Sequence, residues 1–330
     1  MSKSEFPKHV RPLTAADLER VIEIDTPYAL RSRRGFFEAR LKAAKADPKG
    51  FIYIGYERGG NLQGYLFARL ADGEFGEAAP VAFLDALAVD PNGTHAGVAR
   101  AMMGGLETAL KRRGVAAIQS EVDWRNTSLV DFLAAAGFEL APRHIVERDL
   151  STPVPSQPIA SERPASYEID YSDPQSDDFD ALARDIVPCR SLKASDLPAL
   201  VRIGGEIFGR DRATYYQRKM NEVLNESGVR VSMVAELDEH VVGFVMARVD
   251  FGEFGRLEPG AVIDTIEVDP AYQQRHVGMA LISQLQANLT SLRVDVARSA
   301  VYWNQFALLA FLEANGFTPS QRLSFRRRVF

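Results

Sequence analysis

The sequence predicts an α+β protein of two tandem domains, each a mixed, mostly antiparallel sheet flanked by helices. Two observations lead to this prediction. The chain matches itself at a constant offset of 179 residues, and each copy shows the same order of strand-like and helix-like patterns. The length of 330 residues agrees, because domains commonly hold roughly 100–200 residues.

The self-match needs no gap and is carried by Gly, acidic and aromatic positions. Examples are Gly64–Arg69 with Gly243–Arg248, Asp85 with Asp264, and Trp124 with Trp303. A constant offset through so many such positions indicates duplication of a whole domain. We therefore predict an N-terminal domain at 1–150, a linker at 151–185 and a C-terminal domain at 186–330.

In the first copy, Thr14 and Asp17 form a capping pattern for a helix that extends to about residue 24. Alternating or continuous apolar runs predict strands at 51–56, 64–70 and 81–89. Apolar residues at every fourth position predict a helix at 98–110. A strand at 116–122, a short helix at 127–136 that ends in Gly-Phe, and a strand at 143–150 complete the copy.

The second copy repeats this series. Ser195, Asp196 and Pro198 mark its first helix start. The same patterns then predict strands at 230–236, 241–249 and 261–268, a helix at 277–289, a strand at 294–301, a helix at 306–315 and a last strand at 323–330.

Composition restricts the kind of partner. The net charge is −5, so the chain has no overall basic field and we expect no nucleic-acid partner. The linker is rich in Pro, Ser and acidic residues. The single cysteine, Cys189, excludes an intrachain disulfide framework and favours the cytoplasm. No apolar run approaches 18 residues, so we expect no membrane partner. The residues indicate no metal site and leave the oligomeric state open.

The most informative stretch of each copy joins the third strand to the following helix. It runs from Ala88 to Ala99 in the first copy and from Glu267 to Gly278 in the second. A strand that leads through a Gly-containing turn into a helix presents backbone N–H groups at the helix N-terminus, where an anion can bind. Alone the pattern is weak, because any tight strand–helix turn uses Gly.

Both loops resemble the acetyl-CoA loop of the GCN5-related N-acetyltransferase (GNAT) family, Gln/Arg-x-x-Gly-x-Gly/Ala after a Val-x-Pro. The first copy fits from Thr94 to Ala99, with Thr94 in place of Gln/Arg. The second fits from Gln273 to Gly278, with His276 in place of the first Gly. Asn126 resembles a later family asparagine, where the second copy has Gln305 beside Asn304. The tandem layout is similar to that of mycothiol synthase.

The resemblance implies that acetyl-CoA is the co-substrate, that its pantetheine arm pairs with the family's fourth strand, here 87–89 or 266–268, and that loop amides hold the pyrophosphate. In the second copy this implies cofactor contacts from Ile266, Glu267, Val268, Gln273, Gln274, Arg275, His276, Val277, Gly278, Met279 and Asn304. In the first copy it implies contacts from Leu87, Val89, Thr94, Gly97, Val98, Ala99 and Asn126. We favour the second copy, because Arg275 and His276 add donors for a phosphate.

Three residues are candidates for proton transfer. Asp85 and Asp264 occupy one repeat position, and alternation places each on the same strand face as the residues two and four places later. The alternative is a carboxylate at a turn or paired with an Arg. By the same alternation Glu267 faces the other way. The family's usual acid, a Tyr after the Phe of the last helix, is Leu133 or Leu312 here, and Tyr302 is a substitute candidate.

These inferences predict an N-acetyltransferase that moves an acetyl group from acetyl-CoA to a primary amine of a small molecule. Because both copies lack the tyrosine, a CoA-binding or structural protein without turnover is an alternative. Acetylation of a protein N-terminus is a third possibility. The residues do not identify the acceptor amine.

Overall fold

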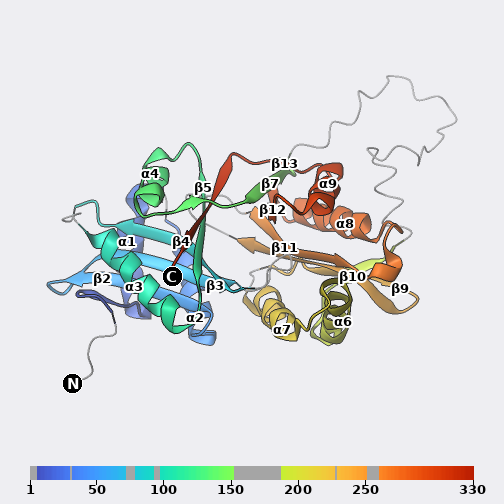
Figure 1. Ribbon diagram of the computed structural model, residues 1–330, viewed down its shortest axis with the longest axis horizontal. Helices are drawn as coiled ribbons and strands as arrows, with labels where there is room; N and C mark the ends of the chain where they lie inside the picture. Colours follow the sequence, from blue (N-terminus) through green and yellow to red (C-terminus); the bar gives the residue numbers. More distant parts are fainter. Residues whose placement is uncertain are drawn as a thin grey trace. The chain divides into compact units, whose positions relative to one another are not determined.

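The computed structural model of the chain describes residues 6–29, 32–71, 79–92, 97–151, 187–226, 229–250 and 260–330. These residues divide into two compact units (Figure 1). The first unit contains the described residues up to Arg143 together with Gln321–Phe330, and the second contains those of His144–Asp250 and 260–320. The acidic linker predicted at 151–185 lies outside the described residues, apart from Ser151.

The first unit has a sheet of seven strands in the order β1-β2-β3-β4-β5-β14-β6. The strands are β1 (Val10–Pro12), β2 (Phe51–Arg58), β3 (Asn61–Ala71), β4 (Val81–Val89), β5 (Ala117–Asp123), β6 (Glu139–Leu140) and β14 (Arg322–Arg328). Two clusters of buried side chains show that α1 (Leu18–Ala29) and α2 (Arg34–Ala46) cover one face of the sheet, whereas α3 (Val98–Arg112) and α4 (Thr127–Ala135) cover the other.

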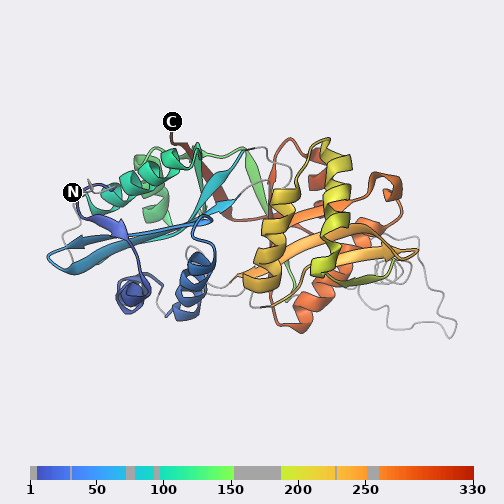
Figure 2. The same cartoon turned by 90° about the horizontal axis from the view of Figure 1, so that it is seen from below.

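The second unit repeats this arrangement in the order β13-β7-β12-β11-β10-β9-β8. Its strands are β7 (Arg143–Asp149), β8 (Cys189–Ser191), β9 (Met233–Leu237), β10 (His240–Asp250), β11 (Gly260–Val268), β12 (Val296–Tyr302) and β13 (Thr318–Pro319). The helices α6 (Leu197–Phe208) and α7 (Ala213–Asn221) lie on one face, and α8 (Val277–Ser291) and α9 (Phe306–Ala314) lie on the other (Figure 2).

Each sheet therefore contains the last strand of the other copy. The strand β14 pairs with β5 from Arg322↔Asp123 to Arg328↔Ala117, and β7 lies between β12 and β13. The expected strand positions are correct, but the boundaries 1–150 and 186–330 assume that each copy keeps its own last strand. They differ from the compact units because β7 and β14 each pair in the sheet of the other copy, and sequence patterns do not state which strand fills which edge.

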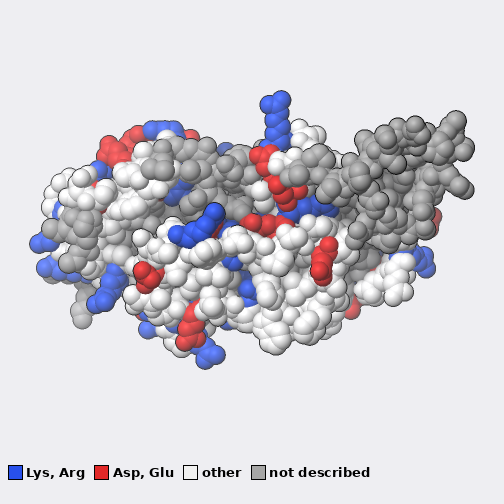
Figure 3. Space-filling view, turned by 90° about the horizontal axis from the view of Figure 1, so that it is seen from above, with Lys and Arg blue, Asp and Glu red and all other residues white. Residues whose placement is uncertain are grey.

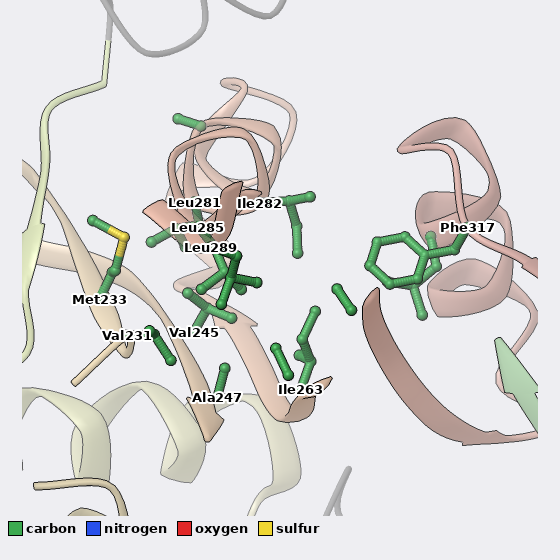
Figure 4. Close-up of a cluster of buried hydrophobic side chains, with 14 of the residues drawn as sticks. Val231, Met233, Val245, Ala247, Ile263, Leu281, Ile282, Leu285, Leu289 and Phe317 are labelled. Carbon is green, nitrogen blue, oxygen red and sulfur yellow. The ribbon is translucent and has the colours of Figure 1, made fainter. Parts of the chain in front are cut away.

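The fold positions the second unit's central strands through a well-packed core. Leu281, Leu285 and Leu289 of α8 are fully buried and pack against Val245 of β10 and Ile263 of β11 (Figure 4). Successive leucines four residues apart lie on one helix face, so the whole apolar side of α8 is turned to the sheet. This packing holds the start of α8 beside the end of β11.

Besides the short strands β1, β6, β8 and β13, the sequence patterns did not predict the helices α2 and α7. Both contain an adjacent aromatic pair, Phe36 and Phe37 in α2, and Tyr215 and Tyr216 in α7, and all four rings are buried. Among the described residues, no helix is both long and apolar enough to cross a membrane.

The exchange of strands gives a direct test. Phe325 of β14 is buried in the core of the first unit, so Phe325→Ala should destabilise that unit by about 3–5 kcal/mol by leaving a cavity. Hydrogen exchange should accelerate in peptides that cover β5 and α4, although the substitution lies at the end of the second copy.

The matched control is Val146→Ala in β7, which lies in the core of the second unit. It should accelerate exchange around β12 and α9 and leave β5 unchanged. Faster exchange at β12 in Phe325→Ala, with β5 protected, would contradict the exchanged pairing.

Candidate functional site

In each unit two parallel strands, β4 and β5 or β11 and β12, separate soon after they pair. The parallel ladder between β11 and β12 joins Gly260, Ala261 and Val262 to Val296, Ala297 and Arg298, and no further pair follows along either strand, both of which are fully described. In the first unit the ladder of β4 with β5 joins only Ala82 to Ile118 and Phe83 to Gln119. The stretch from Ile263 to Val268 thus has β10 on one side and lacks strand partners on the other.

A bulge lies where the strands separate. Met246 pairs with Thr265 and Ala247 with Ile263, so Asp264 is the extra residue of the bulge. Asp85 is the extra residue at the same place in β4, between Leu84 and Ala86. A bulge interrupts the alternation of side-chain directions along a strand.

The bulge changes the side-chain directions along β11 from those that simple alternation predicts. Ile266 and Val268 pack on the α8 side, whereas Asp264 contacts Lys219 of α7 and Glu267 contacts Tyr216 of α7. Asp264 and Glu267 therefore lie on the same face, opposite to that of Ile266 and Val268. Simple alternation placed Glu267 correctly but placed Asp264 on the face of Ile266 and Val268, because it counted no extra residue.

Asp264 belongs to a buried group of charges. Its Oδ2 accepts hydrogen bonds from Lys219 Nζ and from Arg248 Nε, both at 3.1 Å, and Lys219 Nζ also donates to Glu222 Oε2 at 2.8 Å. Asp264 is 6% exposed. In the first unit Asp85 Oδ1 accepts from Arg69 Nε at 3.1 Å, and Arg40 lies 3.5 Å from Oδ2. Both aspartates thus have the paired arrangement that was the alternative to catalysis.

Glu267 has different surroundings. Its Oε2 accepts from the Tyr216 hydroxyl at 2.6 Å, and its Oε1 accepts from Arg212 at 3.1 Å. Burial raises the pKa of Glu267 from 4.5 to about 7, although Tyr216 and Arg212 both act to lower it. A carboxyl group with this pKa holds and releases a proton near neutral pH.

The two copies neutralise the same buried arginine in different ways. Arg33 of the first unit, at the repeat position of Arg212, pairs with Asp25 of α1, whose carboxylate also accepts from Tyr65. The second copy has Gly204 at the position of Asp25, and a Cβ there would lie 1.9 Å from the Tyr216 hydroxyl oxygen. Gly204 therefore makes room for Tyr216, and the carboxylate comes from β11 instead, where the first copy has Ala88.

The loop after β11 is fully described and leads directly into α8. Gln273, Gln274, Arg275 and His276 have exposed side chains, and Arg275 lies over the Tyr272 ring at 5.2 Å. His276 has a φ of 60°, and Gly97 at the same repeat position has a φ of 86°. The left-handed backbone is thus kept in both copies, and His is among the residues other than Gly that tolerate it.

The start of α8 presents donors to this loop. The first N–H groups of an α-helix have no partner within the helix, and here they belong to Val277, Gly278 and Met279. They lie at the end of β11 whose outer edge is unpaired after Val262. This combination can bind a phosphate at the helix and an extended amide chain along the strand.

The first copy offers a partial equivalent. Leu87 and Val89 lie on β4, and α3 begins with Val98 and Ala99 after Gly97. Thr94 lies outside the described residues. Asn126 accepts a hydrogen bond from the Leu129 N–H at 3.2 Å and so caps α4; this use of its side chain is structural.

The remaining candidates lie at the far end of β12. Tyr302 is its last residue and is half-buried, and Asn304 is exposed in the turn before α9. Leu133 and Leu312, where the family has its tyrosine, are buried in the cores. Cys189 is half-buried, and burial raises the pKa of its thiol to about 11. Arg212, Tyr216 and Lys219 are functional candidates that were not predicted, and their signal in the sequence is the repeated Arg and the paired aromatic positions of α2 and α7.

Solved structures with the same fold span nearly the whole chain. A tandem GNAT protein from the clavulanic acid biosynthesis pathway is 16% identical, with a TM-score of 0.60 and coverage of 97% of this chain and 98% of that one. A GCN5-related N-acetyltransferase from Sphaerobacter thermophilus is 14% identical, with a TM-score of 0.55 and coverage of 98% and 97%. These likenesses support the fold.

A third solved structure is the N-myristoyltransferase of Saccharomyces cerevisiae with bound myristoyl-CoA. It is 12% identical, with a TM-score of 0.57 and coverage of 99% of this chain and 80% of that one. No curated protein matches the chain.

The acetyltransferase (GNAT) family profile matches the chain twice, at residues 18–138 and 197–317. Both bounds of the second match lie 179 residues after those of the first, which is the offset of the internal repeat. Together the two matches cover more than half of the chain. The chain therefore belongs to the GNAT acetyltransferase family and contains two domains of that family in tandem.

Proposed function

We propose that the second unit transfers an acetyl group from acetyl-CoA to a primary amine of a small molecule. The observation that carries this proposal is the edge of β11 that lacks a strand partner from Ile263 to Val268 and leads directly to the N-terminus of α8. An acyl-CoA has the two parts that such a site can bind, a pyrophosphate and an extended arm with two amides.

In this proposal the pyrophosphate binds the amides of Val277, Gly278 and Met279 together with the side chains of the loop. Arg275 and His276 supply charge and further donors, and Gln273 and Gln274 supply amide groups. The backbone of Ile266 to Val268 pairs with the pantetheine arm, as a strand would. Asn304 lies in the turn at the end of the neighbouring strand.

The polar face of β11 indicates the side from which the amine arrives. Asp264, Thr265 and Glu267 contact side chains of α7, whereas Ile263, Ile266 and Val268 pack on the apolar α8 side. An amine is polar and must lose a proton to form an amide. We propose that it approaches on the α7 side and that Glu267 accepts its proton, directly or through water.

Asp264 and Asp85 are weaker candidates for this role. Asp264 Oδ2 already accepts from two cationic side chains, and Asp85 has Arg69 and Arg40 beside it. The first copy has Ala88 where the second has Glu267. This difference supports the second copy as the catalytic one.

A CoA-binding protein without turnover is the second candidate function. Its supporting observation is that Leu312 and Leu133 occupy the position of the family's tyrosine and are buried in the cores. Release of free thiol from acetyl-CoA in the presence of a panel of amines separates an enzyme from a binder.

Surface charge is consistent with a small-molecule partner. Acidic and basic side chains are interspersed on the described part of the face in Figure 3. The lone Cys189, whose burial keeps its thiol protonated, is consistent with the reducing cytoplasm, which is the location we propose.

Acetyl-CoA binding tests the assignment to the second copy. Gly278→Glu should weaken the affinity at least about tenfold, because a carboxylate in the first turn of α8 repels the pyrophosphate. A Cβ at Gly278 would lie 3.2 Å from the Phe311 ring, which must shift slightly, and the first copy accommodates a Cβ at this repeat position in Ala99. A Glu in a first helical turn also favours the helix, so the thermal midpoint should hold.

The matched control is Ala99→Glu, which should leave the affinity measured by calorimetry within about twofold of wild type. Weaker binding in Ala99→Glu alone would assign the site to the first copy. Failure of wild type to bind acetyl-CoA would refute the proposal.

The pH dependence tests Glu267. The transfer rate should rise with pH up to about 7, where the carboxyl group loses its proton, and then level off. Glu267→Gln should lower kcat by roughly 100-fold and abolish this limb of the profile. Asp264→Asn is the comparison, and a larger loss there with the limb unchanged in Glu267→Gln would show that Asp264 is the base.

The same pKa predicts a change in stability that needs no substrate. The folded state holds the Glu267 proton more tightly than the unfolded state, whose carboxyl has a pKa of 4.5. Stability should therefore fall by about 3 kcal/mol as the pH rises from 4.5 to 7. Denaturant titrations of wild type and Glu267→Gln should show that the variant lacks this decrease.

A further inference from the structure

A serine hydroxyl joins the two strands at the point where their ladder ends. Ser299 of β12 follows the last paired residue, Arg298, and its hydroxyl donates to the Ile263 carbonyl oxygen of β11 at 3.0 Å. The first copy repeats this contact, with Ser120 donating to the Leu84 carbonyl at 3.3 Å. Ser299 is 1% exposed, so its hydroxyl is buried beside the point where the ladder of β11 and β12 ends.

The length of the pantetheine arm places the sulfur of acetyl-CoA at this end. From the phosphate oxygen to the sulfur the arm has about as many successive bonds as four residues of backbone, so it spans ~14 Å when extended. An arm that starts beside Val268, where the loop to α8 begins, ends beside Asp264. Asp264 directly follows Ile263, whose carbonyl receives the Ser299 hydrogen bond.

During the reaction the Ser299 hydroxyl gains a stronger acceptor than the Ile263 carbonyl, namely the sulfur of CoA. A hydrogen bond to a charged group is roughly twice as strong as one between neutral groups. The sulfur of a neutral thioester is no stronger a hydrogen-bond acceptor than the Ile263 carbonyl. It becomes a stronger one as the carbon–sulfur bond breaks, because the sulfur then carries negative charge. A contact that strengthens only at that stage lowers the barrier without tightening substrate binding.

We propose that Ser299 donates a hydrogen bond to the sulfur of CoA as it leaves, in the role that a tyrosine hydroxyl would have had at the position of Leu312. This inference rests on the proposed acetyl-CoA site of the second unit. The amine nitrogen forms a bond to the acetyl carbon, and the carbon–sulfur bond breaks with its electron pair on the sulfur. The amine proton goes to Glu267, and Ser299 keeps its own proton.

Other hydroxyl groups near β11 are engaged elsewhere. Thr265 shares a hydrogen bond with Tyr215, and Tyr216 donates to Glu267 at 2.6 Å. Both lie on the α7 side of the sheet, whereas the Ser299 hydroxyl reaches from β12 to the Ile263 carbonyl of β11. Its position therefore suits the sulfur.

The test uses CoA itself and needs no acceptor amine. The pKa of the bound CoA thiol is read from the ultraviolet absorbance of the thiolate in wild type, Ser299→Ala, Ser299→Thr and Ser120→Ala. We expect Ser299→Ala to raise this pKa by roughly one to two units, because the thiolate loses a charge-assisted hydrogen bond. Ser299→Thr, which keeps a hydroxyl, should restore most of the effect, and Ser120→Ala should match wild type.

Desulfo-CoA, which lacks the sulfur, separates this role from a structural one. Its affinity should change less than about threefold in Ser299→Ala, while thiolate affinity at alkaline pH should fall about tenfold or more. Equal losses for both ligands, or an unchanged thiol pKa, would overturn the inference while leaving the acetyl-CoA site intact.

Two further outcomes are decisive. A thiol pKa that changes in Ser120→Ala and not in Ser299→Ala would overturn the assignment to the second copy. Absence of binding of both ligands to folded wild-type protein would refute the acetyl-CoA proposal, and this inference with it.

Discussion

The rest of the second unit depends on the buried pairing of Asp264 with Arg248 and Lys219. A carboxylate that is 6% exposed would be very costly without cations beside it, because burial removes its hydration. Arg248 lies on the neighbouring strand β10. The ion pair therefore joins Asp264 to β10, although Asp264 has no backbone pairing partner on that strand. The bulge is therefore a place where charge, and not backbone pairing, maintains the geometry of the strand.

The bulge determines what the end of β11 can do. Beyond it, Glu267 is directed to α7 and Ile266 and Val268 to α8, while the edge towards β12 no longer has strand partners. One strand thus separates a polar face, an apolar face that packs in the core, and an edge without strand partners. Arg212 and Tyr216 then bind the Glu267 carboxylate, so its burial leaves neither oxygen without a hydrogen bond.

Much of the fold was predictable because the repeat doubled each local signal. The strand from Val81 to Val89 and the helix starts after Gly97 and His276 agree with the prediction, since apolar periodicity and turn residues act locally. The exchanged last strands were not predictable, because the local pattern of a strand does not state which sheet edge it fills. The bulge at Asp264 likewise leaves no mark in the apolar pattern, so Asp264 was assigned to the wrong face of β11, whereas Glu267 was assigned correctly.

The way the copies differ explains why only one of them has a carboxyl group suited to a base. A buried arginine needs one acidic partner, and in the first unit Asp25 of α1 supplies it together with the Tyr65 hydroxyl. With Asp25 present, a second carboxylate on β4 would bury a charge that has no cationic partner, and the residue at that position of β4 is the uncharged Ala88.

In the second unit the helix has Gly204 in place of the acid, which leaves room for the Tyr216 ring, and Arg212 pairs with the strand carboxylate of Glu267. A carboxyl group thereby lies on the strand that would bind acetyl-CoA, and its burial raises its pKa to about 7. The difference between Asp25 and Gly204 is thus linked through one arginine to the presence of a carboxyl group at Glu267.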